Sequence, residues 1–342
     1  MTMNVQFVRL RASVAPTIFA AGLLVACSPA PLAAQSTGKG TELTERWSRA
    51  FKVPQNGSLD LHNLAGEVVV TGGPGDEIRI EAVKRIRGAT GDSRAQLESL
   101  SIRVSEASGR VEIQTEFPHT GKRFHAEVGF RIHVPQRAAV AIQTVSGDIR
   151  MERVDGEARV ESVSGNLGLT DVRQLQRAKT VSGNVTIAGF AGDVMTAGTV
   201  SGTLLAKGGK AKGCDLQSVS GNVSLAGSLC HRAQLRSISG NIDFAGELAP
   251  GGRYEFNSHS GDVRLAIAGG SGFQLVANTF SGTLQSDLDL GERRELESRR
   301  PGRQRQQLRG TVGDGSAYVV VKTFSGSVTL VGAKAAARPA HR

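Results

Sequence analysis

The dipeptide Ser-Gly recurs at an almost constant interval along this 342-residue chain. Successive copies lie 18, 18, 19, 19, 19, 21, 21 and 44 residues apart, each within the pattern Ser/Thr, apolar, Ser, Gly, Asp/Asn/Thr/Ser, aliphatic, with one histidine at the apolar position. A period of this length is typical of solenoids, whose units are too small to bury a face alone and stack to share one core. The serines are Ser146, Ser164, Ser182, Ser201, Ser220, Ser239, Ser260, Ser281 and Ser325.

Each unit contains two short apolar runs separated by a tight turn. Val223 and Leu225, for example, follow one Ser-Gly and precede Ala226-Gly227. Roughly 19 residues per unit, at ~3.3 Å each, give a coil perimeter of at most ~60 Å, which suits a slim two- or three-sided coil. We therefore predict an all-β fold, a β-solenoid or β-helix-like stack of coils of about 18–21 residues. A half-repeat near Gly156 and Gly192 keeps antiparallel hairpins open as an alternative, but the equivalence of whole units favours parallel stacking.

The recurrent glycine is expected where the chain bends with a positive φ or where successive coils approach closely. In six copies an Asp or Asn follows it, and stacked side chains of this kind can bond to one another and cap a turn. These residues need no catalytic explanation. They are Asp148, Asn166, Asn184, Asn222, Asn241 and Asp262.

The residue before each repeat serine forms a second ladder. Strand alternation points it away from the core, and the nine stacked copies would make an apolar stripe ~40 Å long. A local bend could instead turn these residues inward. If they point outward, the stripe could dock the N-terminal segment, a second copy or a surface partner. Its members are Val145, Val163, Val181, Val200, Val219, Ile238, His259, Phe280 and Phe324.

The flanks of the repeat region (138–330) differ from it. Residues 47–137 read as a β-rich N-terminal cap, with Leu64 to Val68 as a degenerate repeat copy. Residues 287–314 carry an Arg-rich insertion with few apolar residues, which predicts a solvated loop. Residues 317–330 restore a last strand pair, and residues 331–342 are expected to be disordered.

The N-terminus resembles an export signal. Arg9 and Arg11 precede an apolar stretch that is too short to span a bilayer comfortably. Cleavage before a lipidated Cys27 (signal 1–26) and ordinary cleavage after Ala34 (signal 1–34) are both compatible, and residues 35–46 read as a flexible linker. The protein is expected in the periplasm, on the outer membrane as a lipoprotein, or at the cell surface.

The formal charge of +10 favours acidic partners. For an exported chain these are envelope glycans, anionic lipid or another surface protein, and without an interleaved aromatic platform nucleic acid is not expected. The Arg-rich insertion is the candidate for weak, salt-sensitive polyanion binding. Its arginines are Arg293, Arg294, Arg299, Arg300, Arg303, Arg305 and Arg309.

Cys214 and Cys230 are the cysteines of the body of the chain. Counted back from the next repeat serine, they lie three residues out of step, which on a straight strand separates them by up to ~10 Å, beyond the ~7 Å limit for bridged Cα atoms. We therefore predict that they are not disulfide-bonded, unless the chain turns a corner at this point.

No motif for a nucleophile elbow, a zinc helix, a phosphate loop or a dinucleotide site occurs in the sequence. Equivalent serines in nine copies cannot each have a His and an Asp partner, so a structural ladder explains them better. Asp148 and Asp262 are the acidic members of the turn ladder and lie several coils apart, whereas solenoid enzymes need clustered carboxylates. No catalytic residue, cofactor or metal ligand is predicted, and a polysaccharide lyase or hydrolase is kept as the alternative.

The chain resembles a known family in three features: a Gly-x-Val-x-Val strand near the N-terminus, the run Ile132-His133-Val134-Pro135, and the repeated Thr-Val-Ser-Gly-Asp-Ile phrase. Together they resemble the bacterial putative-adhesin proteins with β-strand repeats, an exported or membrane-anchored family of unknown function. The resemblance covers about residues 47–330 and implies a surface role, adhesin-like binding or scaffolding, with no catalytic residues to carry over.

Overall fold

The computed structural model describes residues 42–87, 93–117, 125–268, 270, 272–291, 294–297 and 306–333. The chain divides into two compact units, Met1–Gln35 and Ser36–Arg342, and every described residue belongs to the second. The expected export signal, Cys27 and most of the linker lie outside the described residues, as do residues 334–342. The described part is all-β except for one short helix, α1 (Ser93–Ser99).

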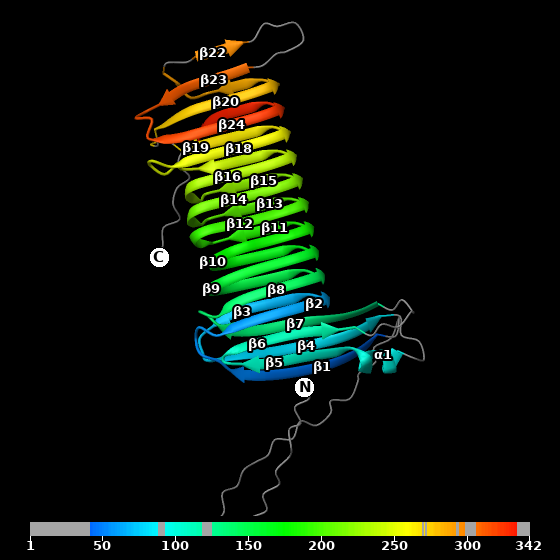
Figure 1. Ribbon diagram of the computed structural model, residues 1–342. Helices are drawn as coiled ribbons and strands as arrows, with labels where there is room; N and C mark the ends of the chain where they lie inside the picture. Colours follow the sequence, from blue (N-terminus) through cyan, green and yellow to red (C-terminus); the bar gives the residue numbers. More distant parts are fainter. Residues whose placement is uncertain are drawn as a thin grey trace, which may run out of the picture. The chain divides into compact units, whose positions relative to one another are not determined.

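Parallel strands form two faces of a stack of coils (Figure 1). Strands that end at a repeat serine form what we call the serine-side face, and strands that begin after the repeat glycine form the glycine-side face. The serine-side strands are β8 (Ala139–Ser146), β12 (Ala191–Ser201), β14 (Lys210–Ser220), β16 (Leu229–Ser239), β18 (Arg253–Ser260), β20 (Phe273–Ser281) and β24 (Ala317–Ser325). The glycine-side strands are β11 (Val185–Ala188), β13 (Leu204–Lys207), β15 (Val223–Ala226), β17 (Ile242–Gly246), β19 (Val263–Ala268), β21 (Leu284–Ser286) and β25 (Val328–Ala333).

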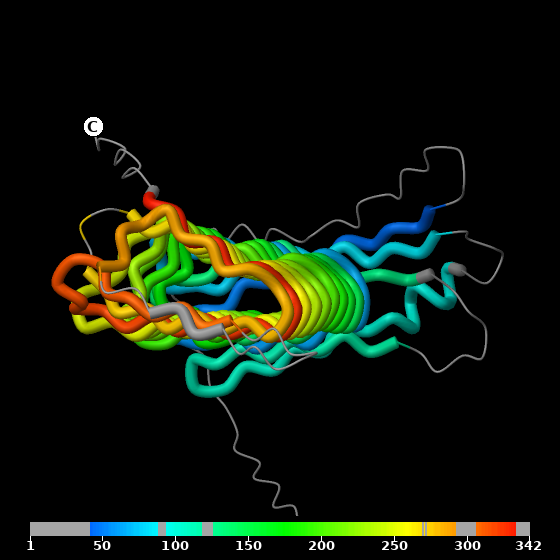
Figure 2. The backbone as a smooth tube through the Cα atoms, turned by 90° about the horizontal axis from the view of Figure 1, so that it is seen from above, coloured from blue at the N-terminus to red at the C-terminus, as the bar shows by residue number. Residues whose placement is uncertain are grey.

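The coils stack in parallel with the repeat in register, as predicted. β9 (Ile149–Ser164) and β10 (Leu167–Ser182) run through both faces, and Ser164 pairs with Ser182. Ser201 likewise pairs with Ser220, and Ser220 with Ser239. Seen along the stack, the coils lie over one another as a narrow loop (Figure 2). Each residue type of the repeat therefore forms a ladder along the stack.

The repeat glycines sit where neighbouring coils approach most closely. Gly221 has a φ of 156°, and its N–H donates to the carbonyl of Ser239 at 2.9 Å. A Cβ atom at this position would overlap the carbonyl oxygen of Gly202. Beside the glycines, the side chain of Asn184 accepts from the N–H of Thr203 at 2.8 Å. The turn ladder is therefore structural, as the sequence indicated.

The last coils do not stack in the order in which they occur along the chain. β24 pairs with β18 on one side and with β20 on the other, so Ser325 faces both Ser260 and Ser281. β25 is inserted between β19 and β21 in the same way. The final coil thus fills a space between two earlier coils, which the double-length step in the repeat makes possible.

The Arg-rich insertion 287–314 is not a solvated loop throughout, so that expectation is wrong. β22 (Arg294–Glu297) pairs antiparallel with β23 (Gln306–Val312), and β23 pairs antiparallel with β20. Leu308 of β23 and Leu290 are both buried. The reason is that β20 ends the stack and its unpaired backbone groups accept a further strand, a partner that composition alone does not reveal.

The N-terminal segment begins with a coil of its own. β2 (Ser58–Ala65) pairs in parallel with β8, and β3 (Val68–Gly73) with β9, so the degenerate copy around Gly66 is a genuine coil. Further strands flank it: β7 pairs in parallel with β3, β6 in parallel with β2, and β4, β1 and β5 are antiparallel additions. Their bounds are β1 (Leu43–Lys52), β4 (Glu77–Arg87), β5 (Ser101–Ala107), β6 (Arg110–Glu116) and β7 (His125–Pro135). α1 packs against β1 and β4.

One hydrophobic core runs the length of this unit. Alternate residues of each strand, such as Ile142, Leu216 and Leu235, are buried completely or nearly so. Because each coil buries its apolar side chains against those of the next, stability depends on stacking rather than on any single coil.

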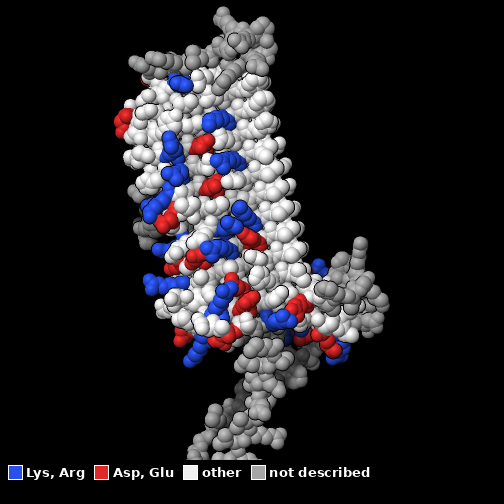
Figure 3. Space-filling view, in the orientation of Figure 1, with Lys and Arg blue, Asp and Glu red and all other residues white. Residues whose placement is uncertain are grey.

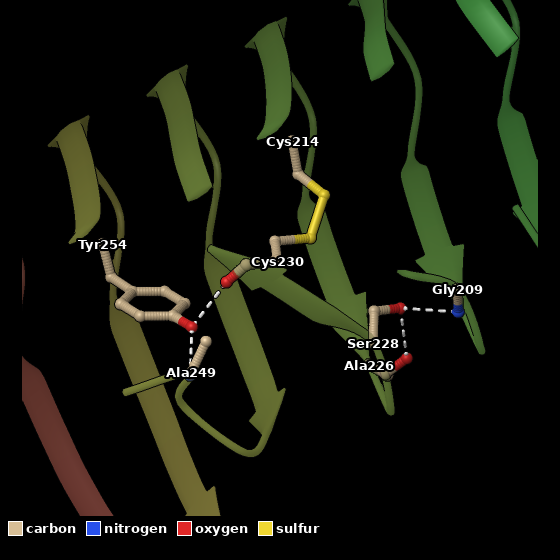
Figure 4. Close-up of a disulfide and its surroundings, with 7 residues drawn as sticks. All are labelled: Gly209, Cys214, Ala226, Ser228, Cys230, Ala249 and Tyr254. Atoms are coloured by element: carbon tan, nitrogen blue, oxygen red, sulfur yellow. Dashed lines mark hydrogen bonds between the residues drawn. A yellow bond between two sulfur atoms is a disulfide. The ribbon is translucent and has the colours of Figure 1, made fainter. Parts of the chain in front are cut away.

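Cys214 and Cys230 form a disulfide, with Cα atoms 6.2 Å apart (Figure 4), so the predicted free thiols are wrong. The three-residue offset is real, since Cys230 pairs with Ala211. The error lies in treating the strand as straight. Gly213 and Cys214 are consecutive and both buried, which breaks strand alternation and marks a corner. Around this corner both cysteine side chains are buried in the interior, where their sulfur atoms meet.

Tyr254 packs beside this corner and should contribute measurably to stability (Figure 4). Its hydroxyl donates to the carbonyl of Cys230 at 2.6 Å and accepts from the N–H of Ala249 at 2.7 Å, and burial raises the pKa of the phenol. We expect Tyr254→Phe to lower the free energy of unfolding by about 1–3 kcal/mol, because both backbone groups lose their buried partner. Denaturant unfolding measures this. Tyr318→Phe, at an exposed ring, is the control and should have little effect, and equal losses in the two variants would contradict the prediction.

Candidate binding groove

The residues before the repeat serines point outward and remain uncovered. Val181 is 48% exposed, Val200 43% and Ile238 54%. His259 is also exposed, Phe324 is 49% exposed and Phe280 is half-buried. We call this row the apolar strip. Leu64 of the first coil extends it at 43% exposure.

Hydroxyl groups account for the outward direction of the strip. The residue before each strip residue is a Ser or Thr that is buried, and most of these hydroxyls donate to a glycine carbonyl of a neighbouring coil. Thr199 donates to Gly183 at 3.0 Å, and Ser237 to Gly221 at 3.1 Å. Six of the nine hydroxyls are satisfied in this way, whereas those of Thr144, Ser162 and Ser218 are buried without a hydrogen-bond partner. The exposure of the strip valines shows that the alternative, in which a bend turns them inward, is wrong. The N-terminal strands pair at the end of the stack and leave the strip uncovered.

The strip lies along a groove that crosses the serine-side strands. One stretch, of about 700 Å³, reaches from Lys179 to Phe324, and a second, of about 620 Å³, reaches from His62 to Val200. The two stretches share Lys179, Thr180 and Val200, so they are continuous. Figure 3 shows an uncharged band along the edge of the stack where the arrowheads of Figure 1 end, which is where the strip residues lie.

Aromatic rings form the last part of the strip. His259 and Phe324 stack with ring centroids 4.9 Å apart, and Phe280 and Phe324 stack at 4.8 Å. The rings face one another along the stack, so their edges point outward. Ring edges carry partial positive charge, and this end of the strip therefore suits an electron-rich or anionic group.

A row of polar residues borders the strip two positions earlier in each coil. We call it the inner row, and between the two ends of the larger stretch it contains no carboxylate. Its members there are Lys179, Gly198, Gln217, Arg236, Asn257 and Lys322. The Ser-Gly pattern does not single out these cations, but counting two residues back from each strip position identifies them in the sequence.

The charges of the inner row are only partly compensated. Lys322 lies 3.6 Å from Glu255, which belongs to the next row away from the strip. Lys179 and Arg236 form no ion pair within the described part of the chain. Glu161, two residues before Val163, belongs to the inner row beyond the larger stretch; it is in register with Lys179 and pairs with Arg177 of the next row at 3.2 Å. The larger stretch of the groove is therefore apolar along one side and carries three cations along the other, and Arg236 and Lys322 both help to lower the pKa of Glu255 in the next row.

Carboxylates do not converge anywhere in the groove. Across the described residues no group of three or more His, Cys, Asp or Glu side chains is arranged to hold a metal ion. A hydrogen bond from Asn257 is the main cause that lowers the pKa of Glu255, the opposite of what a general acid needs. Asp148 and Asp262 accept backbone N–H groups of Asn166 and Ser327, both at 2.8 Å. Both carboxylates are therefore hydrogen-bond acceptors of the turn ladder.

The predicted polyanion-binding arginines are only partly placed. Arg309 is exposed in β23, and the backbone of Arg294 belongs to β22. The others lie outside the described residues, so polyanion binding by this insertion stays a prediction. No helix in the described ranges is both long and apolar enough to cross a lipid bilayer.

The repeat, the parallel stack and the N-terminal coil agree with a family model, Toastrack DUF4097, that matches residues 56–331. The chain belongs to this family. No curated protein sequence matches it. The Toastrack match agrees with the resemblance to adhesin-like proteins with β-strand repeats.

Several solved structures are similar to this Toastrack chain at low sequence identity. A putative adhesin from Bacteroides fragilis is 11% identical, with a TM-score of 0.42, and the match covers 84% of this chain and 97% of that one. A putative lipid binding protein from Parabacteroides distasonis is 12% identical, with a TM-score of 0.38 and the same coverage. A putative cell adhesion protein from Clostridium sporogenes is 9% identical, with a TM-score of 0.24, covering 84% and 100%.

Proposed function

We propose that this Toastrack protein is a non-catalytic protein of the cell envelope that binds a partner through the apolar strip. The observation that carries the proposal is the uncovered row of Val, Ile and Phe side chains along a continuous groove. Monomeric proteins seldom expose contiguous apolar patches beyond a few hundred Å², and such patches mark interaction sites. The uniform repeat supports binding or scaffolding along a surface rather than chemistry at one point.

The ends of the stack support the same interpretation. We propose that the strands before the first coil act as an N-terminal cap that keeps the stack from pairing with other chains. β1 and β5 are antiparallel additions at this end, and β1 carries the exposed charged residues Arg46 and Arg49, which discourage edge pairing. An envelope location, reached through the N-terminal signal, belongs to the same proposal, and the disulfide is compatible with an oxidising compartment.

Replacing three strip valines by threonine tests the role of the strip. We expect the variant Val181→Thr, Val200→Thr and Val219→Thr to keep its melting temperature, because these side chains are exposed. We expect it to lose binding, because Thr keeps the shape of Val and adds a polar hydroxyl to the contact. The purified full-length protein and the variant would be screened against lipopolysaccharide, anionic vesicles and matrix proteins.

The control variant carries the same Val-to-Thr substitution at a buried position of a neighbouring glycine-side strand. Val185→Thr places a hydroxyl in the buried core and should lower stability, which calibrates the assay. If the strip variant unfolds, the strip belongs to the core. If it folds and binds every partner as the parent protein does, the strip is not the binding surface and the proposal is wrong.

A further inference from the structure

We infer that the larger stretch of the groove takes an acidic amphipathic helix of a partner protein. This rests on the proposed function and names the partner class. The strip supplies an aliphatic floor from Val200 to Ile238, and the inner row beside it carries Lys179, Arg236 and Lys322. A ligand seated on the strip meets these cations before it meets the carboxylates of the next row.

The spacing of the cations indicates an elongated ligand. Lys179 and Arg236 are three coils apart, and Arg236 and Lys322 two coils apart, by strand register. At ~4.8 Å per coil, these separations are ~14 Å and ~10 Å. A single lipid headgroup satisfies one of the three positions and leaves the others without a partner. A ligand with acidic groups along its length can satisfy all three.

Backbone hydrogen bonding favours a helix over an extended peptide. The groove crosses the strands, and the N–H and C=O groups of its floor are used between coils. An extended peptide lying on Val and Ile side chains would leave some of its own peptide groups without partners, at a cost of about 1–3 kcal/mol each. A helix satisfies its backbone internally, and its pitch of ~5.4 Å approaches the ~4.8 Å coil repeat. About 16 helical residues span the ~24 Å between the first and last cations.

The same features disfavour two other occupants. Glycan hydroxyls need many polar partners, yet hydroxyls such as those of Thr199 and Ser237 are buried and donate to glycine carbonyls. A second copy bound face to face about a two-fold axis perpendicular to the stack would bring the cations of one inner row against those of the other. An acidic helix meets neither obstacle.

Fluorescence anisotropy with a designed peptide tests this inference. The probe is a labelled helix of about 18 residues, ~27 Å long, with Leu at i, i+3, i+4 and i+7 positions and Glu in the adjacent row. Its partner probe replaces every Glu by Lys. We expect the Glu probe to bind the full-length protein, the Lys probe to bind at least about tenfold more weakly, and the affinity to fall with added salt.

Charge reversal in the groove supplies the decisive comparison. The variant Lys179→Glu, Arg236→Glu, Lys322→Glu should lose about tenfold or more in affinity for the Glu probe. A matched control, Lys207→Glu, Lys210→Glu, Arg264→Glu, makes the same charge change at exposed residues outside the groove and should change affinity less than about twofold. Melting temperatures confirm that both variants fold.

The possible results separate this inference from the proposed function. Equal losses in the groove and control variants, or equal binding of the Glu and Lys probes, would overturn the acidic-helix inference. So would a failure of the Glu probe to bind at all. If the valine-to-threonine variant nonetheless loses a glycan or vesicle partner in the screen, the strip is still the binding surface and only the helix is wrong.

Discussion

Gly221→Val should lower the free energy of unfolding by at least about 3 kcal/mol. The φ of 156° at Gly221 is unfavourable for a residue with a side chain, and the new Cβ would overlap the carbonyl oxygen of Gly202 in the neighbouring coil. Both coils must move apart to relieve the overlap, which weakens the ladder bonds between them. At about 2–4 °C per kcal/mol, the melting temperature should fall by roughly 6–12 °C.

Gly168→Val is the matched control for this substitution. Gly168 lies in β10, has no positive φ, and a Cβ there would approach no atom closer than 3.9 Å. Because the site is open and within a strand, Val should be tolerated to within about 0.5 kcal/mol. Thermal unfolding of the two variants side by side measures the difference. Similar melting temperatures for the two variants would contradict the prediction, because they would show that the position of Gly221 tolerates a side chain.

Removing the disulfide should produce an effect of similar size. The bridge joins residues 16 apart in sequence, and closing a loop of this length stabilises a fold by about 3 kcal/mol. Cys214→Ala with Cys230→Ala is expected to lower the free energy of unfolding by that amount. Reductant should lower the melting temperature of the parent protein toward that of the variant, and should leave the variant itself unchanged.

Thiol titration checks the bridge directly. A Cys27→Ser variant leaves Cys214 and Cys230 as the titratable cysteines of the chain. Denatured without reductant, it should show no free thiol, and after reduction both should react. Reaction of both cysteines before reduction would mean that the bridge does not form in solution, and the stability difference between parent and variant should then vanish.

Alternation within the repeat predicted an outward strip, with an inward bend as the open alternative that the exposure of the valines then excluded. Val200 follows an inward-facing Thr199 and precedes a turn, so its direction follows from the two-residue period of a strand. The same count identifies Lys179 and Arg236 as neighbours of the strip. Which of these rows forms a groove could not be predicted, because the depth of a surface depends on the side chains of adjacent coils and on their spacing.

The order of the last strands and the corner of the coil at Gly213 could not be predicted from the repeat pattern. The pairing of Ser325 with both Ser260 and Ser281 depends on a space left open between two coils. The sequence of a repeat unit does not indicate between which coils that unit will stack. The disulfide depends on a corner at Gly213, which a count of residues along a straight strand does not include.

The amino-acid sequence was enough to predict the length of the coil and its glycine ladder; it favoured parallel stacking, and it left both directions of the apolar strip open. These predictions follow from local rules, since strand alternation and the absence of a glycine side chain act within a few residues. The position of the final coil, the hairpin on β20 and the Cys214–Cys230 bridge became clear from the three-dimensional structure. Each of these depends on which open edge or buried neighbour lies within reach in space, and residues far apart in the chain determine that together.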